Sequence, residues 1–99
     1  MLNIEKKTSG TELNVVLEGR LDTTTAPELE KELKDSLDGV AALTIDMKEL
    51  EYISSAGLRV LLSTQKIMNR QGEMKLKNVN ETIMEIFEVT GFSDILTIE

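Results

Sequence analysis

Two short segments carry most of the side chains that could perform chemistry. They are residues 19–25, which read GRLDTTT, and residues 52–58, which read YISSAGL. Ser55 lies at or just before the start of a predicted helix, where unpaired backbone N–H groups and the helix dipole favour a phosphate. Arg59 follows one turn later on the same face and could bind a phosphoryl group on Ser55. The simpler interpretation is that Ser55 caps the helix and that Arg59 is an exposed side chain.

Two aspartates near these segments also have alternative interpretations. Asp22 could accept hydrogen bonds from another molecule, or its carboxylate could form a local turn with Thr23 and Thr24, which is the commoner use of this residue type. Asp46 lies near the end of an apolar segment, where a carboxylate needs a partner or solvent. We therefore interpret Asp46 as a structural carboxylate with satisfied hydrogen bonds.

The residue types that are missing exclude many enzymes. The 99 residues include no cysteine and no histidine, which excludes disulfides, zinc sites of the usual Cys/His kind and any Ser-His or Cys-His catalytic pair. No lysine lies near Ser55 in the sequence to act as a base, and no glycine-rich phosphate loop is present. We expect a protein that is not an enzyme and needs neither a cofactor nor a metal.

Composition and charge indicate a folded protein with few classes of partner. Apolar residues make up 40% of the chain and charged residues 29%, which is typical of a domain with a packed core. A net charge of −7 disfavours nucleic acid and anionic lipid as partners. No apolar run approaches the roughly eighteen residues of a membrane span. We expect one domain over residues 1–99, cytoplasmic, without direct membrane contact and monomeric when free.

Hydrophobic periodicity predicts alternating strands and helices. The predicted elements are, in order, strands Met1–Lys7 and Leu13–Leu17, helix Thr25–Asp38, strand Val40–Met47, helix Ala56–Gln71, strand Met74–Leu76, a helix capped by Asn80 and ended by Gly91, and strand Ile95–Ile98. Thr25 and Glu28 form a predicted capping box. The order β-β-α-β-α-β-α-β indicates an α/β fold, in which an N-terminal hairpin begins a mixed sheet and the later strands are parallel. The two chemical segments should then meet at the edge formed by the carboxyl ends of the strands.

The second predicted helix carries two neighbouring side-chain patterns on its surface. One side carries a basic stripe formed by Arg59, Lys66 and Arg70. Beside the stripe lies a weakly apolar strip formed by Ala56, Val60, Ser63 and Ile67. Either a neighbouring helix covers this strip or the strip is free to bind a partner, and the sequence leaves both arrangements open.

The two chemical segments carry a resemblance that extends over essentially the whole chain. Gly19-Arg20-Leu21-Asp22 followed by Thr25-Ala26, and Tyr52-Ile53-Ser54-Ser55-Ala56-Gly57-Leu58, look like the signature segments of bacterial anti-sigma factor antagonists, which are single STAS domains. The order and spacing of the two segments match as well. The resemblance implies a STAS fold and regulation by partner switching.

Under this resemblance the unphosphorylated protein binds an anti-sigma factor that is a serine kinase, and the sigma factor is released. Phosphorylation by the kinase ends the contact, and a serine phosphatase restores the active form. Ser55 stands at the family's acceptor position; Ser54 replaces the family's Asp and is a competing acceptor. The implied partner surface consists of Asp22, Thr23, Thr24, Ser54, Ala56, Gly57, Arg59, Val60 and Ser63.

The same resemblance allows a rival function, because STAS domains also serve as scaffolding or regulatory subunits of signalling complexes and of lipid transport systems. In that role Ser55 would only cap a helix, and the strip that includes Ala56 and Val60 would dock permanently onto another subunit. Phosphate transfer to Ser55 or Ser54 distinguishes the two functions.

Overall fold

Within residues 2–99, the part of the chain that this computed structural model describes, four strands form one sheet. Its strands lie side by side in the order β1 (Leu2–Ser9), β2 (Glu12–Leu21), β3 (Ala42–Ile53) and β4 (Glu73–Lys77). β1 and β2 pair antiparallel, whereas β3 pairs parallel with both β2 and β4. The predicted mixed sheet with an N-terminal hairpin is confirmed. Met1, the first residue of the predicted first strand, lies outside the described residues.

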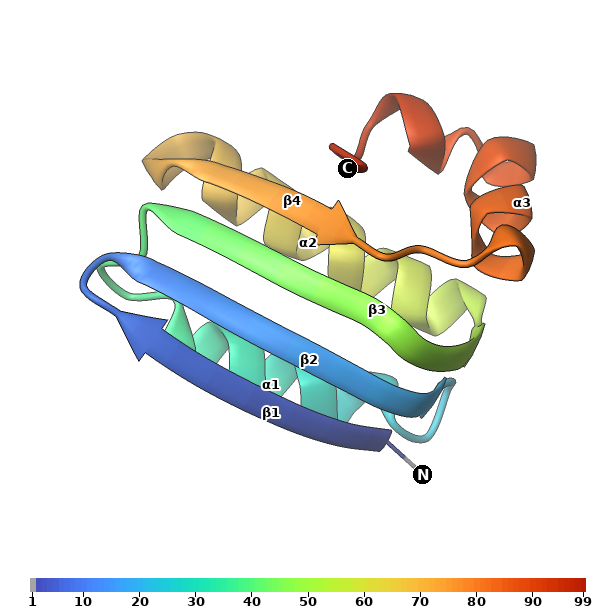
Figure 1. The fold of residues 1–99 in the computed structure, drawn as a ribbon, viewed down its shortest axis with the longest axis horizontal. Helices are drawn as coiled ribbons and strands as arrows, with labels where there is room; N and C mark the ends of the chain where they lie inside the picture. Colours follow the sequence, from blue (N-terminus) through green and yellow to red (C-terminus); the bar gives the residue numbers. More distant parts are fainter. Residues whose placement is uncertain (1) are drawn as a thin grey trace.

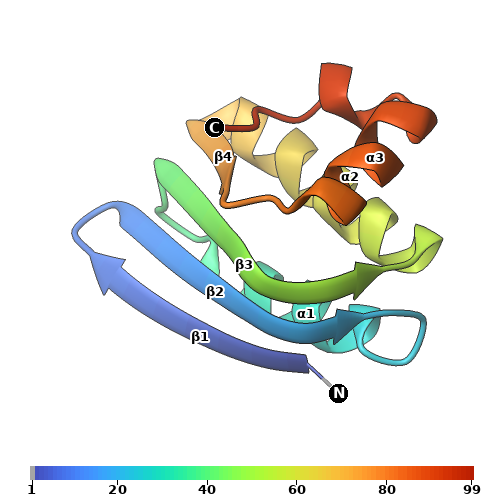
Figure 2. The same ribbon diagram turned by 45° about the vertical axis from the view of Figure 1, so that its right-hand side comes forward.

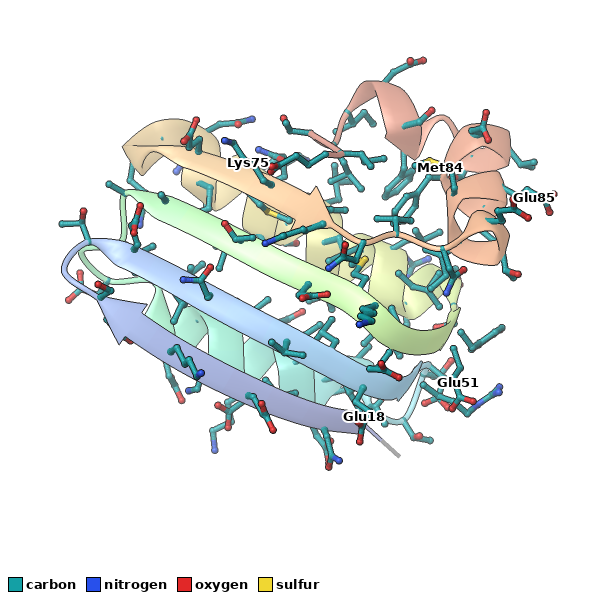
Figure 3. All side chains as sticks on the ribbon, in the orientation of Figure 1. Glu18, Glu51, Lys75, Met84 and Glu85 are labelled. Carbon is teal, nitrogen blue, oxygen red and sulfur yellow. The ribbon has the colours of Figure 1, made fainter. Side chains whose placement is uncertain are left out.

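Helices cover one face of the sheet. α1 (Ala26–Ser36) and α2 (Ser55–Gln71) run side by side behind the strands, and the opposite face of β1, β2 and β3 is open (Figure 1). The covered face is apolar because alternate strand residues point to it, and the core includes Leu13, Val15, Leu17, Leu43, Ile45 and Met47. Glu18 and Lys75 project from the open face (Figure 3).

The strands β2 and β3 extend beyond their predicted ends. The register of their pairing shifts between Val16 and Glu18 and again between Gly19 and Arg20. Such irregularities interrupt the alternation of apolar and polar residues on which strand prediction depends. The predicted ends therefore came too early. In the structure the strands continue to Leu21 and Ile53, and both reach the edge at which the chemical segments lie.

The helix α3 (Glu81–Thr90) packs beyond the end of β4 (Figure 1). Asn80 caps this helix as predicted, since its side-chain oxygen accepts a hydrogen bond from the Ile83 N–H at 2.9 Å. The Asn80 amide also donates to the carbonyl oxygen of Leu50 at 2.9 Å, which attaches the start of α3 to β3. Gly91 ends the helix in the left-handed conformation, with φ of 80°.

The C-terminal segment is less regular than predicted. Phe92–Asp94 forms a 3-10 turn, and the predicted strand at Ile95–Ile98 is reduced to one parallel bridge between Ile98 and Leu76. The 3-10 turn and Ile95 occupy most of the C-terminal segment. Main-chain hydrogen bonds to Leu76 of β4 are made only near the end of the described chain, by Thr97 and Glu99. No helix among residues 2–99 is long and apolar enough to cross a membrane.

Candidate functional site

The two chemical segments meet at one end of the sheet, as predicted. The turn between β2 and α1 and the junction between β3 and α2 lie next to each other in both views of the molecule (Figures 1 and 2). A main-chain hydrogen bond joins them, because the Ser54 N–H donates to the carbonyl oxygen of Leu21 at 2.8 Å. Their relative position is therefore set by the backbone.

Asp22 organises the turn between β2 and α1. One carboxylate oxygen, Oδ1, accepts hydrogen bonds from the Thr24 hydroxyl at 2.7 Å, from the Thr24 N–H at 3.0 Å and from the Thr25 N–H at 3.1 Å. The Thr24 hydroxyl, together with these backbone donors, lowers the pKa of Asp22 below its ordinary value. The local-turn interpretation of Asp22 is confirmed, and it leaves a negative charge at the edge of the sheet at neutral pH.

Thr25 does not form the predicted capping box with Glu28. Its side chain makes no capping hydrogen bond to α1; its hydroxyl donates to the carbonyl oxygen of Arg20 at 2.8 Å and accepts from the Asp22 N–H at 2.8 Å. The Asp22 carboxylate already binds the N–H groups of this turn, so the Thr25 hydroxyl is used to close the turn onto the strand. The buried Thr25 is thus part of the frame that holds Asp22.

The capping role that was assigned to Ser55 belongs to Ser54. Ser54 precedes the first residue of α2 in an extended conformation, and its hydroxyl accepts from the Gly57 N–H at 3.4 Å. Ser55 is the first residue of the helix, and its side chain is exposed. Within residues 2–99, no hydrogen bond occupies the Ser55 hydroxyl. Of the two serines, Ser55 is therefore the one whose hydroxyl is exposed and makes no structural hydrogen bond.

Gly57 was predicted to contact a partner, but it is buried. A Cβ atom at this position would lie 2.7 Å from Cγ of Leu21 and 2.9 Å from Cγ1 of Ile53. Both distances are shorter than van der Waals contact allows. The absence of a side chain lets the start of α2 pack directly against the ends of β2 and β3, so Gly57 positions the site and is not part of its surface.

A groove between α1 and α2 contains several of the predicted partner-binding residues. The open groove has a volume of about 380 Å³ and is lined by Thr23, Ala26, Pro27, Glu30, Ala56, Arg59, Val60 and Ser63. Val60 is only 3% exposed and forms part of the floor, whereas Arg59 and Ser63 are exposed. α1 therefore packs beside the apolar strip and covers it only in part, leaving an open groove.

Sequence reasoning did not identify the α1 side of this groove. Ala26, Pro27 and Glu30 were assigned only to a helix, since nothing in their order shows which neighbour they face. Sequence reasoning also did not pair Arg20 with Tyr52, whose ring centroid lies 4.4 Å from the guanidinium carbon. These two residues are register partners at the ends of adjacent parallel strands, so a correct strand register would have predicted the contact.

Asp46 lies outside this site and has a structural role, as predicted. Its carboxylate accepts hydrogen bonds from the Lys48 N–H at 2.9 Å and from the Asn78 side-chain amide at 3.1 Å. Partial burial alone would raise the pKa of Asp46, but these hydrogen bonds and the nearby charges of Lys77 and Lys48 lower it below the ordinary value. Asp46 thereby connects β3 to the segment that leads into α3.

Comparison with known proteins identifies the family to which this chain belongs. The sequence profile of the STAS domain matches residues 3–99. The anti-sigma-B factor antagonist of Bacillus subtilis (strain 168) is 33% identical over 98 residues, which cover 98% of this chain and 90% of the relative. An anti-sigma-B factor antagonist of Staphylococcus aureus (strain NCTC 8325) is 33% identical over 97 residues, covering 96% of this chain and 90% of the relative. The chain belongs to the STAS domain family.

Solved structures show the same fold. An anti-sigma factor antagonist from Mycobacterium paratuberculosis superposes with a TM-score of 0.89 at 21% identity, covering 99% of this chain and 85% of that one. The anti-sigma factor antagonist SpoIIAA matches in its unphosphorylated form (16% identity, 100% of this chain and 87% of that one) and in its phosphorylated form (15%, 98% and 91%), each with a TM-score of 0.77. These structures share the fold of this chain, and both of the 33% identical relatives are anti-sigma-B factor antagonists.

Proposed function

We propose that this chain is an anti-sigma factor antagonist whose unphosphorylated form binds an anti-sigma factor serine kinase and thereby releases a sigma factor. Phosphorylation of Ser55 ends this contact, and a serine phosphatase reverses it in the cytoplasm. The observation that supports the proposal most directly is the exposed, unbonded hydroxyl of Ser55 at the first position of α2. The capping of α2 by Ser54 leaves that hydroxyl accessible to a kinase.

The electrostatics of the edge explain why a phosphate would end binding. A phosphoserine adds about −1.5 to −2 charges at neutral pH. Asp22 lies on the adjacent turn and is ionised, so the phosphate would increase the negative charge of a surface that a partner must cover. Burying a dianion in a close interface carries a large desolvation cost. The switch then needs no rearrangement of the backbone.

The fold of this chain is found in a relative in both of its phosphorylation states. The chain superposes equally well on the unphosphorylated and the phosphorylated form of SpoIIAA, with a TM-score of 0.77 in each case. We therefore expect the phosphorylated form of this chain to keep its fold. The change in affinity would come from charge and hydration at the α2 N-terminus.

The groove between α1 and α2 is the surface that we propose for the kinase contact. It has an apolar floor at Val60 and a cation at Arg59, and one of its lining residues, Ala56, directly follows Ser55 in α2. An interface of this kind combines a buried apolar centre with a charged rim. Side chains of the partner that fill the groove would bring the kinase close to the acceptor hydroxyl.

The experiment is a phosphorylation and binding assay with a candidate anti-sigma factor serine kinase from the same organism. The wild type should gain one phosphate on Ser55 with ATP, located by mass spectrometry, and Ser55→Ala should gain none while still binding the kinase. Ser55→Asp should bind at least about tenfold more weakly without unfolding. The matched variant Ser54→Ala should still be phosphorylated. A kinase that binds but transfers no phosphate to Ser55 would instead favour a scaffolding role.

A further inference from the structure

We propose that Arg59 binds the phosphoryl group on Ser55, and that phosphorylation thereby withdraws a cation from the groove between α1 and α2. This inference rests on the proposed function, because it concerns the phosphorylated state of Ser55. The switch would then involve two changes in surface charge. The added dianion repels a partner at the edge, and the groove loses the positive charge that would attract one.

Helix geometry places Arg59 within reach of Ser55. Both residues belong to α2 and are four positions apart, so their side chains lie on the same face in consecutive turns. Side chains on a helix lean toward its N-terminus, which directs Arg59 back over the turn that contains Ser55. An acidic group that precedes a basic group by four residues is the more favourable order of such a pair.

Arg59 has no competing partner in the unphosphorylated protein. It is exposed, and none of the three ion pairs found among residues 2–99 includes it. α2 itself contains no acidic residue. Arg20, the other arginine near the edge, stacks on Tyr52 and lies 3.9 Å from the Asp22 carboxylate. Arg59 is therefore the cation that is free to respond to a new phosphate.

The chemistry of the two groups favours a specific contact. A guanidinium presents planar, paired N–H donors that match two phosphate oxygens, and such bonds between charged groups are shorter and stronger than neutral ones. On the opposite side of the groove, the Glu30 carboxylate forms an ion pair with Lys34 at 3.1 Å. With Arg59 bound to the phosphate, an acidic side chain of a partner would no longer find a free cation in the groove.

The test uses protein in which phosphoserine is installed at position 55 during synthesis, so it does not depend on a kinase. The second pKa of this phosphoserine is measured by 31P NMR in the wild-type background, in Arg59→Gln and in the control Arg70→Gln. Arg70 lies on the same basic stripe and has the same charge, but it is about 22 Å along the helix from position 55, which is more than twice the screening length in physiological salt.

We expect Arg59→Gln to raise the phosphoserine pKa by about half a unit and Arg70→Gln to change it by less than about 0.1 unit. The other charged groups at this end of the sheet and in the groove are Arg20 at the end of β2, Asp22 on the turn and Glu30 on α1; they are the same in every variant and cancel in the comparison. Equal shifts in the two variants, or none in either, would overturn the proposal.

A second measurement uses the phosphorylated protein without any substitution. The Nε–H resonance of Arg59 should move through the same transition as the 31P signal, while that of Arg70 should stay constant. A constant Arg59 resonance rejects the contact even if Ser55 is the true acceptor. Absence of phosphorylation by the kinase, in contrast, would count against the proposed function and leave both NMR readouts measurable.

Discussion

The Ser54 N–H donates to the carbonyl oxygen of Leu21 at 2.8 Å, which attaches the start of α2 to the end of β2. Asp22 follows Leu21 and Ser55 follows Ser54, so a main-chain bond sets the distance between the acidic turn and the candidate acceptor. Side-chain substitutions at Asp22 or Ser55 leave this bond in place. The role proposed for Ser55 is therefore separable from the stability of the fold, whereas the Asp22 carboxylate also holds the turn between β2 and α1.

Substitution of the two adjacent serines should change the free energy of unfolding to different extents. Ser54→Ala removes the cap of α2 and should lower the free energy of unfolding by about 0.5–1 kcal/mol, because the Gly57 N–H loses its acceptor. Ser55→Ala should change it by less than about 0.5 kcal/mol, since the Ser55 side chain is exposed. Urea unfolding of both variants provides the measurement. A larger loss from Ser55→Ala would mean that the hydroxyl has a structural task.

The frame of the acidic turn should depend on the Thr25 hydroxyl. Thr25→Val keeps the shape of the side chain but leaves the Arg20 carbonyl oxygen and the Asp22 N–H without their partner, and it should cost about 1–3 kcal/mol. Thr23→Val, in the same turn but exposed, is the matched control and should be nearly neutral. Equal unfolding midpoints for the two variants would contradict this role of Thr25.

Gly57→Ala should destabilise the protein although alanine is the better helix former. The new methyl group would overlap with the side chains of Leu21 and Ile53, at a cost of about 1–3 kcal/mol. Without this overlap, the substitution would gain up to about 1 kcal/mol from helix propensity. Thermal unfolding shows whether Gly57→Ala raises or lowers the stability of the protein. Ser63→Ala, at an exposed position of the same helix, is the control. A stabilised Gly57→Ala would show that α2 can move away from the strands at no cost.

Stability should depend on pH in the acidic range through Asp46. Because the folded protein lowers the pKa of Asp46, this carboxylate stabilises the fold above its unfolded pKa, and the contribution is lost as the pH falls through the folded pKa. Asp46→Asn should therefore be less stable than the wild type above about pH 5, and the difference should narrow below about pH 4. Urea unfolding across this range tests the trend; a constant difference would contradict it.

The sequence was sufficient to predict the features that depend on local pattern. The apolar run that contains Leu43 and Ile45 predicted the central strand, and Asn80 and Gly91 predicted both ends of α3. The pattern failed where tertiary contacts decide. Thr25 binds the end of β2 in place of Glu28, and Ile98 makes one bridge in place of a strand. Neither outcome follows from propensity, since each depends on which groups are already bonded.

The order of elements and the meeting of residues 19–25 with residues 52–58 were determined by the sequence, because parallel strands joined by helices must end at one edge. Tertiary structure alone decided which serine caps α2, which residues of α1 complete the groove, and that Gly57 is buried against Leu21. A residue type specifies the hydrogen bonds and contacts that a side chain can make. Only the packing of the elements specifies which of them it does make.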